Sequence, residues 1–216
     1  MIVIMEIYSP QHKIYRLGPF TTSEIELQDL FKAWLAISVA FGIVLGGIDK
    51  LFSPGFIYIF LFAAVTVGIG FLLHELGHKV VAQRYGCIAE FRAFNMMLLF
   101  ALAMSFFGIV FAAPGAVMIG GRHIDSRKNG IISAAGPIVN ILLALAFIGI
   151  NALFTLPAQL FNYGFMINSW LALFNMIPFG PLDGAKIARW NLPVYLIMLF
   201  TAAAMVFVIS GRIGSI

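Results

Sequence analysis

The sequence predicts an all-α protein that crosses a membrane several times. Of its 216 residues, 62% are hydrophobic and 10% are charged, whereas soluble domains carry roughly 25% charged residues. The 13 Lys and Arg form no basic run, so the composition speaks against nucleic-acid binding. A single cysteine, Cys87, excludes an intrachain disulfide and a site built from several thiolates. The lipid bilayer is therefore the expected partner of most of this surface.

About five full transmembrane helices are expected, because a helix needs about 20 residues to cross the hydrocarbon core. Residues 129–182 contain no charge and are broken near Leu156 and Pro157, so we expect two crossings there. Before the first crossing, residues 1–30 read as an interfacial segment with short β-strands, and residues 31–211 read as one transmembrane domain. The crossings are expected at residues 33–48, 55–73, 131–153, 161–180 and 192–210.

Residues 93–121 are uncharged but too short for two full crossings. The pairs Pro114-Gly115 and Gly120-Gly121 favour irregular backbone near the end of this stretch. Such backbone is tolerated at membrane depth only against protein or water. We therefore expect a re-entrant or hairpin segment here, in addition to the five crossings.

The residues with chemistry are His74-Glu75-Leu-Gly-His78, at the end of the second apolar stretch. Four residues advance a helix by about one turn, so His74 and His78 share a face and can bind one zinc ion. Glu75 is placed to act as a general base on a water molecule activated by the zinc. Ionisable residues inside a membrane span are costly and indicate function.

A catalytic zinc site usually has three protein ligands, so a third is expected downstream. Glu90 and Asp125 lie among basic residues, where solvated charges are expected. Asp183 instead ends the long uncharged stretch, after a run with prolines and a glycine that could present its carboxylate to a metal. Asp183 is therefore the preferred third ligand, in a site with one Zn²⁺ per chain.

The Lys and Arg positions test the path through the membrane independently. If 93–121 returns to the side it left, all basic residues except Lys50 and Arg212 share a side with His78 and Asp183, eleven against two. A single crossing by 93–121 would give six against seven. Cytoplasmic loops carry an excess of Lys and Arg, so we expect the zinc end at the cytoplasmic face of a cell membrane.

These motifs resemble those of the site-2 protease family of intramembrane zinc metalloproteases. His74 to His78 resembles the first family signature, and Asn175-x-x-Pro178-x-x-Pro181-x-Asp183-Gly184 resembles the second. Ala135-Gly136-Pro137 followed by Asn140 resembles the Gly-Pro segment of the family. The resemblance covers about residues 50–190, the expected catalytic core, and no PDZ or CBS module is recognised.

The resemblance implies His74, His78 and Asp183 as zinc ligands, Glu75 as the base, and Asn175 as a group near the metal that stabilises an oxyanion or holds substrate. Substrate contacts are implied for a further set, and for Asn140 a hydrogen bond that links two helices is an equal alternative. That set is Asn140, Pro114, Gly115, Gly120, Gly121 and Pro181.

The resemblance implies hydrolysis of peptide bonds in or near the transmembrane segment of another membrane protein, with an edge of 114–121 pairing with the unwound substrate. Three alternatives remain open. Glu90 could be the third ligand of another membrane zinc protease. The chain could be an inactive membrane chaperone or binding protein that keeps the fold. It could also be a transporter, although no inverted repeat is visible. His123 is expected to be interfacial.

Overall fold

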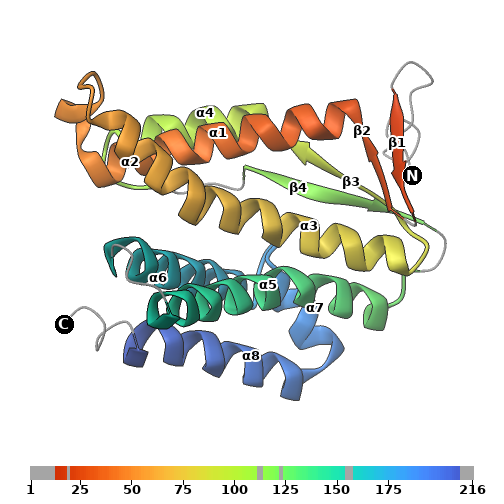
Figure 1. Cartoon of the computed structure of the whole chain (residues 1–216). Helices are drawn as coiled ribbons and strands as arrows, with labels where there is room; N and C mark the ends of the chain where they lie inside the picture. Colours follow the sequence, from red (N-terminus) through yellow and green to blue (C-terminus); the bar gives the residue numbers. More distant parts are fainter. Residues whose placement is uncertain (1–12, 19, 111–113, 122–123, 154–157, 210–216) are drawn as a thin grey trace. The chain divides into compact units, whose positions relative to one another are not determined.

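The computed structural model describes residues 13–18, 20–110, 114–121, 124–153 and 158–209 (Figure 1). Most of these residues are helical, including a short 3-10 helix at Ile48–Lys50 and two π-helical turns, and four short β-strands are present among them. The chain divides into two compact units, one made of Met1–Ala64 with Lys79–His123 and the other of Val65–His78 with Ile124–Ile216. The helix that carries the histidine pair contributes residues to both units.

The first unit begins with a β-hairpin and a long helix. Strands β1 (Ile14–Leu17) and β2 (Phe20–Ser23) pair antiparallel, and α1 (Glu24–Gly46) follows directly. The Ser23 hydroxyl accepts a hydrogen bond of 3.2 Å from the backbone N–H of Glu26, which caps the helix. The expected crossing at 33–48 is thus part of a helix that already begins at Glu24.

The stretch 93–121 is a short helix followed by a returning strand. Strand β3 (Ile88–Ala93) leads into α4 (Asn95–Ser105), and β4 (Gly115–Gly120) then pairs antiparallel with β3 from Ile88 opposite Gly120 to Ala93 opposite Gly115. A Cβ on Gly115 would overlap the Phe91 ring, so glycine permits this close pairing. The segment returns to where it started, as the sequence predicts, while its depth in a membrane stays a prediction.

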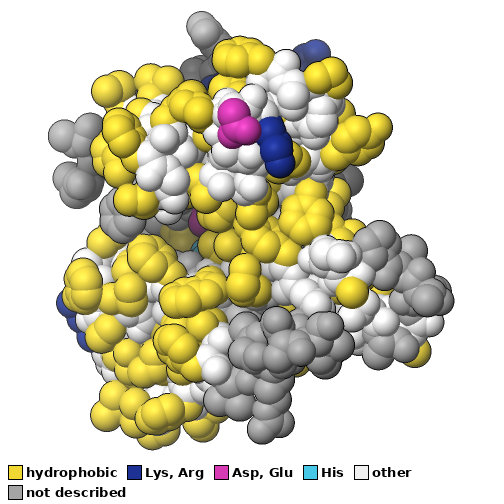
Figure 2. All heavy atoms as spheres, turned by 90° about the vertical axis from the view of Figure 1, so that its left-hand side faces the viewer, with side chains coloured by type: hydrophobic (Ala, Val, Ile, Leu, Met, Phe, Trp, Pro, Cys, Tyr) yellow, Lys and Arg dark blue, Asp and Glu magenta, His cyan; other side chains and the backbone are white. Residues whose placement is uncertain are grey.

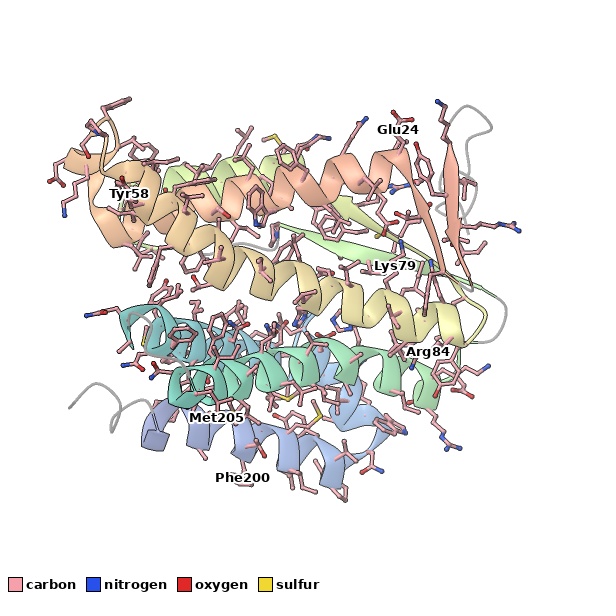
Figure 3. All side chains as sticks on the ribbon, viewed as in Figure 1. Glu24, Tyr58, Lys79, Arg84, Phe200 and Met205 are labelled. Atoms are coloured by element: carbon pink, nitrogen blue, oxygen red, sulfur yellow. The ribbon has the colours of Figure 1, made fainter. Side chains whose placement is uncertain are left out.

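Buried carboxylates at the start of α1 hold β3 in place. The Glu26 side chain is fully buried, pairs with Lys79, and accepts a 2.9 Å hydrogen bond from the Phe91 backbone N–H. Asp29 accepts a bond of 3.3 Å from the backbone N–H of Ala93. Figure 3 shows Lys79 toward the end of this unit where Glu24 and Arg84 also lie, with Tyr58 at the opposite end.

Glu90 corrects one expectation. The sequence suggests a solvated charge, but Glu90 is 1% exposed and pairs with Arg92, so it is a buried ion pair of β3. Asp125 behaves as expected. It is exposed and accepts a 2.7 Å hydrogen bond from the backbone N–H of Lys128 at the start of a helix.

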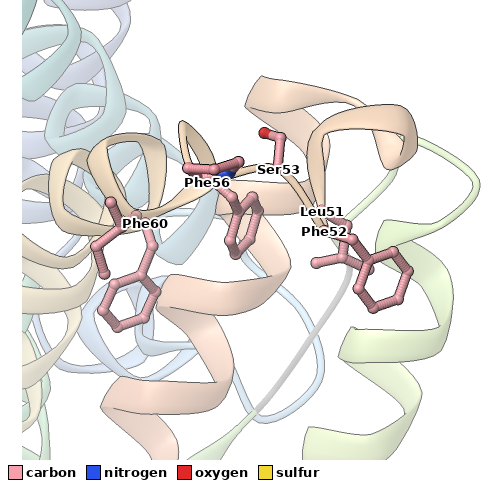
Figure 4. Close-up of a pocket in the computed structure, with 7 residues that line it drawn as sticks. Leu51, Phe52, Ser53, Phe56 and Phe60 are labelled. Carbon is pink, nitrogen blue, oxygen red and sulfur yellow. The ribbon is translucent and has the colours of Figure 1, made fainter.

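Helix α2 (Phe56–Ala63) continues through a π-helical turn (Ala64–Gly68) into α3 (Ile69–Arg84), which places the expected crossing at 55–73 in one long helix. The loop before α2 forms a hollow of about 490 Å³ (Figure 4). Its lining includes Leu51, Phe52, Phe56 and Phe60, and none of its lining residues has a titratable side chain. This hollow therefore offers no acid, base or metal-ligating histidine.

The second unit is a bundle of helices around the C-terminal part of the chain. It contains α5 (Ser126–Leu153), α6 (Ala158–Asn175), α7 (Asp183–Trp190) and α8 (Leu192–Ala204), and α8 ends in a π-helical turn at Met205–Ile209. Helix α5 packs against α6 and α7. One core cluster joins Ala134, Met176, Ile187, Tyr195 and Met198.

Among the described residues, three helices are long and apolar enough to cross a membrane: Glu24–Gly46, Phe56–Arg84 and Ser126–Asn151. The crossings expected at 161–180 and 192–210 form α6 and α8, of which Leu192–Phe207 is a shorter apolar helix. A count of five full crossings therefore stays a prediction. Hydrophobic side chains dominate the face in Figure 2, and several are largely exposed, which suits contact with lipid.

Candidate metal centre

The two histidines of α3 lie on one face and point their ring nitrogens at a common place. His74 Nε2 and His78 Nε2 are 3.0 Å apart, and the rings meet edge to face at 84°. Their exposed fractions are 6% and 8%. The four-residue spacing therefore has the consequence that the sequence predicts, within the second unit alone.

Asp183 joins the two histidines from a different helix. It is the first residue of α7, after Leu182 in an extended conformation. Gly184 lies so close to the Met176 carbonyl that a Cβ would overlap it, so this glycine lets α7 begin against the end of α6. Asp183 Oδ2 lies 3.1 Å from His78 Nε2 and 3.4 Å from His74 Nε2.

The three donor atoms have the spacing that a zinc ion requires. Tetrahedral coordination with bonds of about 2.0–2.1 Å places neighbouring ligand atoms about 3.3 Å apart. The observed separations of 3.0, 3.1 and 3.4 Å fit this triangle, and two imidazoles with one carboxylate are a donor set typical of zinc. In the part of the chain that the structure describes, these three residues are the group that could hold a metal ion.

Burial alone would raise the pKa of the Asp183 carboxyl. When the imidazoles of His78 and His74 carry a proton, their charge and hydrogen bonds outweigh burial and hold this pKa below its usual range. The second oxygen, Oδ1, lies 3.6 Å from the Lys186 ammonium group. Sequence reasoning treated Lys186 only as a topology signal.

Helix α5 supplies three consecutive contacts to the histidine pair. The Ile132 carbonyl accepts a 2.8 Å hydrogen bond from His78 Nδ1, and Asn140 Oδ1 accepts one of 2.6 Å from His74 Nδ1. Gly136 lies between them, where a Cβ would be 2.6 Å from His74 Nε2 and closer still to His78 Nε2. Positions 132, 136 and 140 share one helix face, so α5 cradles both imidazoles.

Both histidines thus have their Nδ1 hydrogens occupied by oxygen acceptors, which leaves the Nε2 lone pairs directed at each other and at Asp183. The three atoms can therefore bind one cation between them, as the donor set indicates.

Glu75 and Asn175 have less defined surroundings. Glu75 is buried on α3. Asn175 is half-buried, and its Nδ2 donates a 2.9 Å hydrogen bond to the Leu171 carbonyl within α6. The roles of Glu75 as a base and of Asn175 near the metal stay predictions.

Asn140 is fully buried and bonded to protein groups, which favours the helix-linking alternative over substrate contact. The remaining expected substrate residues stay predictions. Pro181 is exposed just before α7. Pro114, Gly115, Gly120 and Gly121 lie in or beside β4 of the first unit.

Pro114 accepts a 2.9 Å hydrogen bond from the Phe94 backbone N–H, which extends the β3–β4 pairing by one residue. His123 lies outside the described residues. Sequence reasoning missed Asn168, which bonds to Asn140, although a polar residue in an apolar helix is a signal that could have found it.

The fold and the cluster define a helical membrane protein with a buried group of two histidines and an aspartate that could hold a metal ion. No family model and no solved structure matches the chain. The putative zinc metalloprotease MJ0611 of Methanocaldococcus jannaschii is 38% identical over 177 residues, which cover 80% of this chain and 87% of that protein.

Two bacterial proteins are more distantly similar. Putative zinc metalloprotease YwhC of Bacillus subtilis is 28% identical and covers 61% of this chain and 69% of its own. Putative zinc metalloprotease Rip2 of Mycolicibacterium smegmatis is 27% identical, with 68% and 70% covered. The chain belongs to the site-2 protease family of zinc metalloproteases.

Proposed function

We propose that this protein is an intramembrane zinc metalloprotease that hydrolyses peptide bonds in or near the transmembrane segments of other proteins. The observation that carries the proposal is the buried triangle of His74 Nε2, His78 Nε2 and Asp183 Oδ2, with the buried Glu75 next to His74 in the sequence. A purely structural metal site would have no use for this additional carboxylate. The names of the relatives support zinc and proteolysis.

In the proposed mechanism, His74, His78 and Asp183 hold the ion, which when bound polarises the scissile carbonyl and acidifies a water molecule. Glu75 takes a proton from that water and delivers it to the leaving amine. All four residues are buried, with residue exposures of 9% or less, which limits bulk solvent and strengthens these electrostatic interactions. Asn175 Nδ2 donates one hydrogen to the Leu171 carbonyl, and its second hydrogen would bind substrate or an oxyanion.

A substrate helix must unwind locally, because helical hydrogen bonds shield its carbonyls from attack. Strand β4 supports a way to satisfy the unwound backbone. Among the described strands it pairs only with β3, so its second edge has no strand partner there and could pair with an extended segment. The bias of Lys and Arg supports a site that opens to the cytoplasmic side of the cell membrane.

The test replaces Glu75 with Gln in detergent-purified protein and measures both zinc per chain and cleavage. The probes are single-span test proteins whose transmembrane helix contains a Gly-Pro break, with an all-Leu helix as the comparison. Loss of a general base lowers the rate by about 10²- to 10⁴-fold. We expect Glu75→Gln to retain zinc and lose cleavage.

Wild-type protein that binds zinc but cleaves no probe at any concentration, while behaving like Glu75→Gln in every assay, would favour a binding protein. Unchanged cleavage in Glu75→Gln would remove Glu75 from the mechanism. An exposed acidic residue, Glu24, gives the matched control, because Glu24→Gln leaves both zinc and cleavage unchanged in this account.

A further inference from the structure

We infer that Asn168 and Asn140 form a buried amide relay that holds His74 in the one tautomer able to bind the metal. Both are positioning residues, since they act through His74. The inference rests on the zinc site proposed above and adds a residue of α6, Asn168, to the groups that determine metal affinity. All members of the relay lie within the second unit.

The direction of the relay follows from backbone carbonyls, which can only accept hydrogen bonds. The Gly164 carbonyl accepts a 2.9 Å bond from Asn168, so the atom that Asn168 turns to it is Nδ2 and the atom facing Asn140 is Oδ1. The Gly70 carbonyl likewise accepts a 3.1 Å bond from Asn140 Nδ2. The orientation of both side-chain amides is therefore determined without reference to the histidine.

The consequence for His74 is a fixed hydrogen position. Asn140 turns its oxygen to His74 Nδ1 at 2.6 Å, and an amide oxygen can only accept, so the hydrogen lies on Nδ1. The lone pair then lies on Nε2, which is the nitrogen directed at His78 and Asp183. Each bond in the series from Gly164 to His74 thus points the same way.

The packing around Asn168 leaves a space that fits its side-chain amide. Both asparagines are fully buried, where an amide that loses a partner is costly. A Cβ on Gly70 would lie 3.1 Å from Asn168 Cγ and closer still to its Oδ1, so glycine at 70 makes room for the amide. Gly70 is one helical turn before His74, so Asn140 contacts both the ring and the turn that carries it.

The two histidines differ in the group that accepts the hydrogen bond from Nδ1. His78 Nδ1 is bonded to the Ile132 backbone carbonyl, which a side-chain substitution does not remove. His74 Nδ1 is instead bonded to the Asn140 side chain, which is in turn bonded to the Asn168 side chain. Metal affinity should therefore respond to substitution at Asn168, although Asn168 does not contact the metal ligands directly.

The experiment measures the zinc dissociation constant by competition with a chromophoric chelator for wild type, Asn140→Ala, Asn168→Ala and the double variant. Removing a partner of a ligating histidine costs about 10- to 100-fold in affinity, and we expect this for Asn140→Ala. Asn168→Ala, one step farther away, should cost about 3- to 10-fold. Because Asn168 acts through Asn140, the double variant should equal Asn140→Ala.

Ser169→Ala is the matched control. Ser169 follows Asn168 on the same helix, is fully buried, and bonds only to the Phe165 carbonyl of its own helix among the contacts described. Its removal should leave zinc affinity unchanged. The relay is overturned if Ser169→Ala loses as much zinc affinity as Asn168→Ala. It is also overturned if Asn168→Ala lowers zinc affinity by the same factor in the Asn140→Ala background as in the wild type. Either result would show general damage to α6.

If Asn168→Ala binds zinc as tightly as the wild type, the relay is overturned and the proposed function is unaffected. If the wild-type protein itself binds no measurable zinc, both the relay and the proposed function are overturned. Should Asn140→Ala fail to fold, ¹⁵N spectra of imidazoles in zinc-free wild type and Asn168→Ala decide. His74 assigned as the Nδ1–H tautomer in wild type, with that tautomer reduced in Asn168→Ala, supports the relay. An Nε2–H tautomer in wild type overturns it.

Discussion

Replacing Gly136 with alanine should abolish tight zinc binding while the helices still fold. The added Cβ would lie 2.6 Å from His74 Nε2, whereas ordinary contacts begin at 3.4 Å. The ring must therefore move by about 0.8 Å, and metal–ligand distances tolerate only about 0.2 Å. His78 must move at least as far, because its Nε2 is closer still. Both displacements open the ligand triangle.

We expect zinc affinity in Gly136→Ala to fall by about 100-fold or more, at the upper end of losses seen when ligand orientation is disturbed. The stability cost should stay near 1–3 kcal/mol, because the atoms in the way are ends of side chains and not backbone. Zinc is measured by chelator competition, and stability by thermal unfolding of the zinc-free protein in detergent.

Gly149 provides the control on the same helix. A Cβ there meets nothing within 4 Å, so Gly149→Ala should bind zinc normally and gain about 0.5–1 kcal/mol of stability. Wild-type zinc affinity in Gly136→Ala would refute the reasoning, because it would mean that the imidazoles bind the ion from positions other than those described.

Two further results are expected. Glu26→Ala should lower the free energy of unfolding by about 3–5 kcal/mol, because it leaves Lys79 buried without its ion partner. The control Glu24→Ala, at an exposed position, should change this free energy by about 0.5 kcal/mol or less. Equal losses for the two variants in chemical denaturation would argue against the buried pair. Adding zinc at about 100 times its dissociation constant should stabilise the chelator-treated protein by about 2.7 kcal/mol, and a thermal shift of the same size in His78→Ala would assign the effect to another site.

The candidate metal ligands could be predicted because they lie in two short sequence motifs. Two histidines four residues apart on a helix must share a face, and their presence in the same chain favours the aspartate at the break in the long apolar stretch as a third ligand over a turn residue. The contacts of α5 with the imidazoles were harder to predict from the sequence. Gly136 and Asn140 belong to a segment that resembles the family, but their contacts with the imidazoles depend on how α5 packs against α3.

Helix α1 begins earlier than the crossing expected within it, for an identifiable reason. Counting uncharged residues places a boundary after Lys32, yet Ser23 and Glu26 have the Ser-x-x-Glu spacing of a capping box that begins a helix earlier. The burial of Glu26 and Glu90 could not be predicted from the sequence. It depends on ion pairs, and for Glu26 the partner, Lys79, is remote in the chain.

The most direct test of the central claim is the zinc content per chain of detergent-purified wild type, Asp183→Ala and Asp125→Ala. Asp183 and Asp125 both lie at helix starts, but Asp183 is buried in the cluster and Asp125 is exposed. We predict about one zinc ion in wild type and Asp125→Ala and clear loss in Asp183→Ala, as expected for a three-ligand site. Equal zinc in all three proteins would contradict the account, because Asp183 would then not be a ligand.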